Sequence, residues 1–301
     1  MIDSSEYSAT TQLLALHKFG RITPRLFEVL FRHFGSLSEI ISASHDAVAA
    51  VPGMTAEVAE QVSSAKDYLD DAETFALGFA DRDIVISGRH GADYPSLLSE
   101  LNDPPPLLFV RGHLPAADKR TVALVGADQA TNDGMELTTR LAKQFAEKKI
   151  QIVSSLFGGI DYASHLGCRA AGGESFAVLD YGFDCLEGEE AVPLAIDVAR
   201  NGGIISEYFP SQMPSDQTMI ESNRLVAGLA QAVVVPECYS TSERTLDLLS
   251  FCNEIGKLSF LVVDPDHSPL FDESSLNHAL KNGAVLMEGL EKVDDIVKVL
   301  V

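Results

Sequence analysis

The chain has 301 residues, 46% of them hydrophobic, and a formal net charge of −22 at pH 7, because 44 Asp and Glu outnumber 22 Lys and Arg. No apolar run is long enough to span a membrane, and the length suits one large α/β domain with a smaller companion. Proteins that hold nucleic acid through a broad surface present clustered Lys and Arg. The composition therefore argues against that mode of binding and leaves open only a local basic patch.

The cysteine pattern and the N-terminus bear on the cellular compartment. The four cysteines show no C-x-x-C spacing, which favours reduced, structural thiols over metal or redox roles; they are Cys168, Cys185, Cys238 and Cys252. The first residues lack the basic start and apolar segment of a secretory signal. We expect a cytoplasmic protein with no membrane partner, no metal and no cofactor.

Residues 1–80 predict a small all-α domain, helical from residue 8. Thr23-Pro24 suits a helix N-cap with proline at the first helical position, and Gly35 suits the end of that helix. Two further helices, 44–50 and 55–69, flank a Pro-Gly turn and resemble a helix–hairpin–helix or SAM-like unit. The turn has one glycine and no nearby Lys or Arg, so a structural or partner-docking role is favoured over DNA contact.

Residues 81–301 form the second predicted domain, and its first part, 81–118, is a connector. Strands are expected at 83–87 and 107–111, on either side of the run Asp103-Pro104-Pro105-Pro106. Three prolines cannot continue a helix or a central strand, so the run is predicted to be rigid and irregular.

From residue 120 onward, apolar strand patterns alternate with helical ones. Strands are predicted at 121–125, 150–153, 175–179, 203–206, 232–235, 258–263 and 284–287. Helices are predicted at 134–148, 161–171, 189–200, 220–230, 243–255, 273–281 and 292–300. This alternation predicts an extended Rossmann-like, doubly wound and mostly parallel sheet. Ligands of such folds bind beyond the carboxyl ends of the strands, which directs attention to the loops 126–134, 154–161, 180–188, 207–222 and 236–243.

The stretch from Ile150 to His165 is the most informative of these. An apolar strand ends near Ser154, passes through Gly158-Gly159, and restarts as a helix for which Asp161 is the expected N-cap. The glycines suit either a tight turn alone or a seat for an anion at the helix N-terminus. His165 lies one helical turn after Asp161, which suits either an acid–base pair or, as the favoured interpretation, a structural hydrogen bond.

Other polar residues are predicted to lie near the edge of the sheet. Asn223-Arg224 belongs to a predicted helix at that edge, and Arg224 is a candidate anion contact or a surface salt bridge. Glu207 follows a strand. The acidic loop 180–190 has irregular spacing, which favours a solvated loop over a metal site.

Read in order, these motifs resemble the DNA-processing protein A (DprA/Smf) family. The resemblance rests on Tyr94-Pro95, the segment 103–112, Gly126, Ser154 to His165, the segment 202–207, and Ser222 to Leu229. It implies a protein that binds single-stranded DNA, loads a RecA-like recombinase during natural transformation, and forms a homodimer. The family's optional C-terminal winged-helix domain is expected to be absent, since the last predicted helix reaches the end of the chain.

The chain departs from the family pattern at basic positions. The family has Gly-Ser-Arg at 126–128, Ser-Gly-x-Ala-Arg-Gly-Ile-Asp at 154–161 and Arg-Asn-Arg at 222–224, where this chain has Asp128, Gly158 and Ser222 in place of arginine. Arg224 remains, and Arg244 is a newcomer. Each lost phosphate contact lowers the salt dependence of binding, so the resemblance predicts weakened single-stranded DNA binding.

The sequence contains no recognisable catalytic constellation, so we expect a binding protein rather than an enzyme. The candidate DNA- or phosphate-binding residues are Gly126, Ser154, Gly158, Gly159, Asp161, His165, Asn223, Arg224 and Arg244. Two alternatives remain open: a nucleotide or small-ligand sensor that uses the same pocket, and a protein-interaction module whose pocket has decayed.

Overall fold

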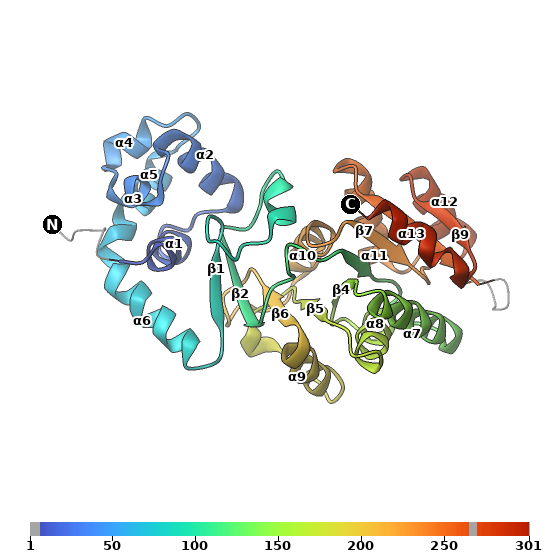
Figure 1. Ribbon diagram of the computed structural model, residues 1–301. Helices are drawn as coiled ribbons and strands as arrows, with labels where there is room; N and C mark the ends of the chain where they lie inside the picture. Colours follow the sequence, from blue (N-terminus) through green and yellow to red (C-terminus); the bar gives the residue numbers. More distant parts are fainter. Residues whose placement is uncertain (1–6, 265–269, 301) are drawn as a thin grey trace. The chain divides into compact units, whose positions relative to one another are not determined.

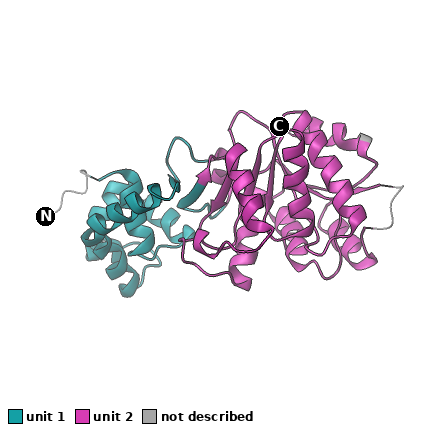
Figure 2. Ribbon diagram, turned by 90° about the horizontal axis from the view of Figure 1, so that it is seen from below, with its two compact units in different colours: residues 1–94, 102–110 teal, residues 95–101, 111–301 magenta. Residues whose placement is uncertain are grey.

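The computed structural model describes residues 7–264 and 270–300. The chain divides into two compact units (Figure 2). The first comprises Met1–Tyr94 and Asn102–Val110, and the second comprises Pro95–Leu101 and Arg111–Val301. Of the helices in the described residues, none is both long and apolar enough to cross a bilayer.

The first unit is helical up to Ala80. Thr23 caps α2 as predicted, its hydroxyl accepting from the Leu26 amide at 3.2 Å, and Gly35 ends that helix with φ of 82°. Buried leucines, isoleucines and Phe27 form the core. The helices are α1 (Ala9–Lys18), α2 (Pro24–Phe34), α3 (Leu37–Ser42), α4 (His45–Ala49), α5 (Ala56–Ser64), the 3-10 turn η2 (Ala65–Tyr68) and α6 (Leu69–Ala80).

The single helix predicted at 55–69 was wrong at its C-terminal end, where residues 65–68 form a 3-10 turn. The α-helical pattern ends at Ser64 and continues as η2. Ser63 and Ser64 donate their hydroxyls to the carbonyls of Glu60 and Gln61, at 3.3 and 3.0 Å. Such side-chain bonds to the preceding turn compete with regular helix geometry.

A β-hairpin follows, and its paired residues lie in the first unit. Strand β1 (Val85–Gly88) pairs antiparallel with β2 (Leu107–Gly112), with Val85 opposite Val110. The strand begins later than predicted because Asp83 has a φ of +55°, outside the extended region. Between the strands, Tyr94 donates its hydroxyl to the Pro105 carbonyl at 2.8 Å and so holds the proline run, which is irregular as predicted.

The second unit contains a parallel sheet in the strand order β6-β5-β4-β3-β7-β8-β9 (Figure 1). The predicted doubly wound, mostly parallel fold is confirmed. The strands are β3 (Thr121–Leu124), β4 (Gln151–Ser155), β5 (Ser175–Val178), β6 (Gly203–Ser206), β7 (Ala232–Val235), β8 (Leu258–Val263) and β9 (Val285–Glu288).

Each successive pair of these strands is joined through a helix. The predicted boundaries agree within a few residues, except that α10 starts one turn earlier because Ser215 and Thr218 form a capping box. The second unit also contains the short 3-10 turns η3 (Ser96–Glu100), η4 (Phe183–Cys185) and η5 (Leu290–Lys292). The helices are α7 (Asn132–Glu147), α8 (Gly159–Ala170), α9 (Ala191–Asn201), α10 (Asp216–Gly228), α11 (Glu243–Glu254), α12 (Glu273–Lys281) and α13 (Val293–Val299).

The helices form two layers, and the strand order reverses at β3. Helix α7 packs against α8 and α8 against α9, whereas α10 packs against α11 and α11 against α12. The chain moves from β3 through β4 and β5 to β6 on one side, and from β7 to β9 on the other. Doubly wound sheets bind ligands where the order reverses, so the loops after β3, β4 and β7 are the expected site.

Candidate functional site

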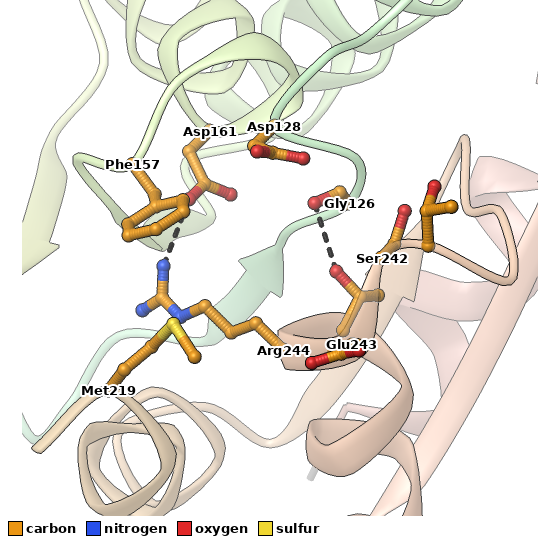
Figure 3. A pocket seen from close by; sticks show the side chains of 10 residues that line it. Gly126, Asp128, Phe157, Asp161, Met219, Ser242, Glu243 and Arg244 are labelled. Carbon is orange, nitrogen blue, oxygen red and sulfur yellow. Dashed lines mark hydrogen bonds and ion pairs between the residues drawn. The ribbon is translucent and has the colours of Figure 1, made fainter. Parts of the chain in front are cut away.

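A pocket of about 170 Å³ lies at that reversal point (Figure 3). It opens between the loop after β3, the loop between β4 and α8, and the first turn of α11, with one residue from α10. It is lined by Gly126, Asp128, Phe157, Asp161, Met219, Thr241, Ser242, Glu243, Arg244 and Thr245.

Gly126 lets the loops after β3 and β7 approach each other. A Cβ at this position would lie 2.5 Å from the Glu237 carbonyl oxygen. The Ala127 amide donates to that same carbonyl at 3.0 Å, and the Thr245 hydroxyl donates to the Gly126 carbonyl at 2.9 Å. Gly126 is therefore a structural requirement of the pocket wall.

Glu237 is a fully buried acid that the sequence analysis missed. Its carboxylate accepts the Thr131 amide at 3.0 Å and the Tyr239 hydroxyl at 2.7 Å. A Cβ at Gly134 would lie 1.7 Å from one carboxylate oxygen, so the first turn of α7 fits closely around this side chain. Glu237 thus fixes the start of α7 beside the pocket, and a single acidic residue after a strand gave no signal of that role.

The sequence left open whether Gly158-Gly159 makes a tight turn alone or also seats an anion, and the structure shows the geometry of the turn. Gly158 has φ of +133° and Gly159 φ of +45°. A Cβ on Gly159 would lie 2.3 Å from the Ala127 carbonyl oxygen, to which the Ile160 amide donates at 3.0 Å. The corner therefore docks the start of α8 directly on the loop after β3.

Asp161 is not the N-cap of α8, and that prediction was wrong. The cap position is Gly158, so Asp161 is the third residue of the helix. Acidic side chains are favoured at both places, which is why the sequence did not separate them. The carboxylate instead accepts the hydroxyl of Ser155, and burial raises its pKa, while the nearby Arg244 opposes that rise.

Arg244 is the cationic group of the pocket. It lies in the first turn of α11, and its Nη1 donates to the Ser155 hydroxyl and stands 3.5 Å from Asp161 Oδ2. The guanidinium also lies over the ring of Phe157, 5.3 Å from the ring centroid. Figure 3 shows it directed toward Phe157 and Asp161. Its backbone carbonyl accepts from Asn223 Nδ2 at 3.1 Å, so Asn223 supports the residue from α10.

His165 and Asp161 both contact Ser155, but at different atoms. Nε2 of the fully buried His165 lies 3.0 Å from the Ser155 carbonyl oxygen. Burial lowers the pKa of His165 to about 4, so the ring is neutral near pH 7. Within the part of the chain that the structure describes, Nδ1 has no hydrogen-bond partner, so the direct bond to Asp161 suggested by the spacing is not formed. The pair positions Ser155 and shows no acid–base geometry.

Two further predicted site residues lie outside the pocket lining. Ser154 is buried and donates its hydroxyl to the Leu124 carbonyl at 2.7 Å, which ties β4 to β3. Arg224 is buried and forms an ion pair with Glu207. The guanidinium of Arg224 is thus engaged with an acid of the strand end rather than presented to the pocket.

Phe157 and Met219 are pocket residues that the sequence analysis did not single out. Phe157 is 47% exposed although it is aromatic, and it stands where the family pattern has alanine. The signal for this residue in the sequence was an aromatic side chain in a loop directly before a pair of glycines. The ring gives the pocket a flat apolar surface next to its one arginine.

The acidic loop and the cysteines add no further centre. Among the described residues, no group of three or more His, Cys, Asp or Glu is arranged to hold a metal ion. The four cysteines are free, and burial raises the pKa of the Cys168, Cys238 and Cys252 thiols to about 12. Such thiols are protonated at neutral pH and poor nucleophiles.

A parallel sheet with a reversal of strand order, and a small pocket beside the starts of α8 and α11 at that point, defines a Rossmann-like fold. The sequence profile of the family described as DNA recombination-mediator protein A matches residues 85–300. The chain belongs to this family.

Curated relatives carry the same assignment. Protein Smf from Synechocystis sp. is 27% identical over 275 residues, which cover 90% of this chain and 68% of that protein. DNA processing protein DprA from Bacillus subtilis is 32% identical over 153 residues, half of each chain. The chain thus spans about half the length of the Bacillus subtilis and Streptococcus pneumoniae DprA proteins that it matches.

Solved structures share the fold. The X-ray structure of DprA from Streptococcus pneumoniae superposes with a TM-score of 0.74 at 23% identity, covering 94% of this chain and 95% of that one. DprA from Helicobacter pylori, described for its single-stranded DNA binding mode, gives a TM-score of 0.62 at 22% identity, covering 72% of this chain and 97% of that one. At these identities the likeness establishes the architecture of the chain.

Proposed function

We propose that this protein binds single-stranded DNA through the pocket at the reversal of strand order, with Arg244 as the main phosphate contact. Membership of the recombination-mediator family supports the ligand class, as does the single-stranded DNA binding described for the Helicobacter pylori relative. The observation that carries the proposal is the guanidinium of Arg244, which a helix start directs into a pocket otherwise lacking Lys and Arg among its described lining residues.

The helix starts around the pocket suit an anion. Helices α8 and α11 both begin there, and neither of their N-cap residues, Gly158 and Ser242, makes a side-chain capping bond, in contrast to the N-cap residues of α7, α10 and α12. First-turn N–H groups and the positive end of the helix dipole attract phosphate. A volume of about 170 Å³ is below the range of about 300–1,000 Å³ typical of whole drug-sized ligands, so it suits a phosphate group with its base outside.

Phe157 offers a place for that base. Base–aromatic stacking contributes about 1–3 kcal/mol per base in proteins that bind single strands, and it tolerates any sequence. The exposed ring next to Arg244 places a stacking surface beside the phosphate contact. The expected ligand is therefore a DNA strand read through its backbone and one stacked base.

Binding is expected to be weak. Asp128, Asp161 and Glu243 line the pocket together with Arg244, so acids outnumber bases around the phosphate position. Each phosphate contact to a single strand contributes about 0.7 to the salt slope, and the arginines of the family pattern are replaced at 128, 158 and 222.

Family resemblance extends the proposal to partners. A RecA-like recombinase and a second copy of the chain are the partners implied, in the cytoplasm, with a role in recombination during natural transformation. The role is that of a binding protein rather than an enzyme. It predicts faster assembly of recombinase on single-stranded DNA when the protein is added, and an unchanged assembly rate would count against it.

The direct test of the proposed function is fluorescence anisotropy of a labelled oligo-thymidine. Arg244→Ala should weaken binding about tenfold or more, the worth of one charge-assisted hydrogen bond. Arg169→Ala is the matched control, because Arg169 is an exposed arginine of α8 that pairs with Asp197 away from the pocket. Equal affinities of wild type and Arg244→Ala would overturn the proposal, provided that circular dichroism confirms the fold of both.

A nucleotide sensor is the second candidate function. It is favoured because the pocket is small and offers one aromatic ring, Phe157, beside one guanidinium, Arg244, which suits a single nucleotide. A free nucleoside monophosphate would then raise the melting temperature of wild type and leave that of Arg244→Ala unchanged. If neither oligonucleotide nor mononucleotide binds, the remaining hypothesis is an interaction module whose pocket has decayed.

A further inference from the structure

We propose that Asp161 competes with the incoming phosphate for Arg244, so that ligand binding frees Asp161 from its ion pair and is coupled to the uptake of a proton. The proposal rests on the proposed function, because it takes Arg244 as the phosphate contact. It adds an internal competitor, and with it a dependence of affinity on pH, to that site.

The competition follows from which atom of Arg244 is engaged. Nη1 donates to the Ser155 hydroxyl and faces Asp161 Oδ2 at 3.5 Å, while Ser155 donates its hydroxyl to the same carboxylate oxygen. Arginine holds phosphate best with two adjacent N–H groups. The guanidinium must therefore turn away from Asp161 and Ser155 before it presents such a pair with Nη1 to a phosphate in the pocket.

Ser155 makes this contact particular to the chain. The family pattern has glycine at position 155, which has no hydroxyl to offer, and the pattern has no arginine at position 244. Here the two residues form one network with Asp161. Within the described residues, Nε of Arg244 is buried and has no hydrogen-bond partner, so it does not face a phosphate that enters from solvent, and the pair of N–H groups offered to that phosphate must include Nη1.

The cost of freeing Asp161 produces the proton linkage. The carboxylate is buried and its cation is Arg244. A buried carboxylate without a cation is strongly disfavoured in its charged form and takes up a proton instead. Burial already raises the pKa of Asp161, and Arg244 is the charged neighbour that counteracts it, so removing Arg244 raises the pKa further.

The neighbouring titratable groups on α8 do not account for such a proton. On α8, burial lowers the pKa of His165 to about 4 and raises the pKa of Tyr162 from its ordinary value, so both stay neutral between about pH 5 and about pH 8. On α11 and after β3, Glu243 and Asp128 are exposed to solvent. Asp161 is thus the buried acid whose partner the ligand removes.

The first test uses the unaltered protein. Titration calorimetry with oligo-thymidine near pH 7, in two buffers of different ionisation enthalpy, measures the protons taken up on binding. We expect uptake of up to one proton, and an affinity that rises up to about tenfold for each pH unit of acidification at constant ionic strength. Binding without proton uptake and without pH dependence would overturn the competition.

The second test uses two variants of pocket acids. Asp161→Asn keeps the shape but removes the charge, so affinity should rise and the proton uptake should disappear. Asp128→Asn is the matched control, because Asp128 is an exposed acid of the same pocket: its affinity should rise modestly while the proton uptake persists. If Asp161→Asn fails to fold, the calorimetry of the wild type decides alone.

The outcomes separate this inference from the proposed function. Arg244-dependent binding with no proton uptake overturns the competition and leaves DNA binding intact. Binding by Asp161→Asn but not by the wild type supports the competition, since the ion pair then closes the pocket. Absence of binding in both proteins overturns both.

Discussion

The guanidinium of Arg244 and the carboxylate of Asp161 meet 3.5 Å apart, although they come from the first turns of two different helices, α11 and α8. Both helices start at the edge where the parallel strands end, which brings residues far apart in sequence together at one point. The pair is the centre of the candidate site, and most of its expected properties follow from this geometry.

Phe157→Trp provides a direct report on the pocket. The chain contains no tryptophan, so this substitution introduces a single fluorophore beside Arg244. Since an indole stacks on bases at least as well as a phenyl ring, we expect retained affinity and quenched emission when oligo-thymidine is added. Phe157→Ala should weaken binding by about 1–3 kcal/mol. Unquenched emission at saturating oligonucleotide would argue that the base lies elsewhere.

Arg224→Ala should destabilise the fold rather than remove a DNA contact. Removing one partner of a buried ion pair costs about 3–5 kcal/mol, because the remaining charge keeps its desolvation cost. Urea denaturation should show this loss for Arg224→Ala, and Arg224→Ala combined with Glu207→Gln should recover much of it. A loss below about 1 kcal/mol would mean that Arg224 is dispensable to the fold.

Gly159→Ala should lower the stability of the fold more than Gly172→Ala, because Gly172 also has a positive φ but lies in open surroundings. Gly159 combines φ of +45° with a Cβ position 2.3 Å from the Ala127 carbonyl, whereas Gly172 has φ of +66° and nothing within 4 Å. Gly172→Ala therefore measures the cost of positive φ alone, about 1–2 kcal/mol. Thermal unfolding should show a clearly larger loss for Gly159→Ala, and equal losses would contradict the close approach.

His165 should make the fold sensitive to acid. Its folded-state pKa is lowered to about 4, so the unfolded chain takes up this proton below about pH 6.5 and the native state only near pH 4. The stability contributed by neutral His165 is complete above about pH 6.5 and falls by about 3 kcal/mol as the pH drops to about 4. Urea unfolding of wild type and His165→Gln across this range should show a difference that shrinks on acidification. A constant difference would mean that the ring titrates normally.

The strands and the site loops were predictable because their signals are local. Apolar runs between helical patterns located β3 to β9, and the rule that ligands bind at the carboxyl edge selected the loops that line the pocket. Gly158-Gly159 was recognisable because glycine adopts positive φ values at the lowest cost.

The side-chain contacts were not predictable, because they depend on long-range packing. Arg244 lies 83 positions after Asp161, and no periodicity links the two. The shared helix face of Asp161 and His165 was correct, but both residues bond to Ser155 of the neighbouring strand end: the Ser155 hydroxyl donates to Asp161, and the Ser155 carbonyl oxygen bonds to His165. Likewise, arginine is the residue type expected at a phosphate contact. Only the position of Glu207 shows that the guanidinium of Arg224 forms an ion pair instead.

The most direct test of the central claim is the salt dependence of oligo-thymidine binding by wild type and Arg244→Ala. If Arg244 contacts a phosphate, its removal should reduce the slope of log affinity against log salt by about 0.7, the value of one contact to a single strand. An identical slope for the two proteins would contradict the claim that this pocket holds DNA through Arg244.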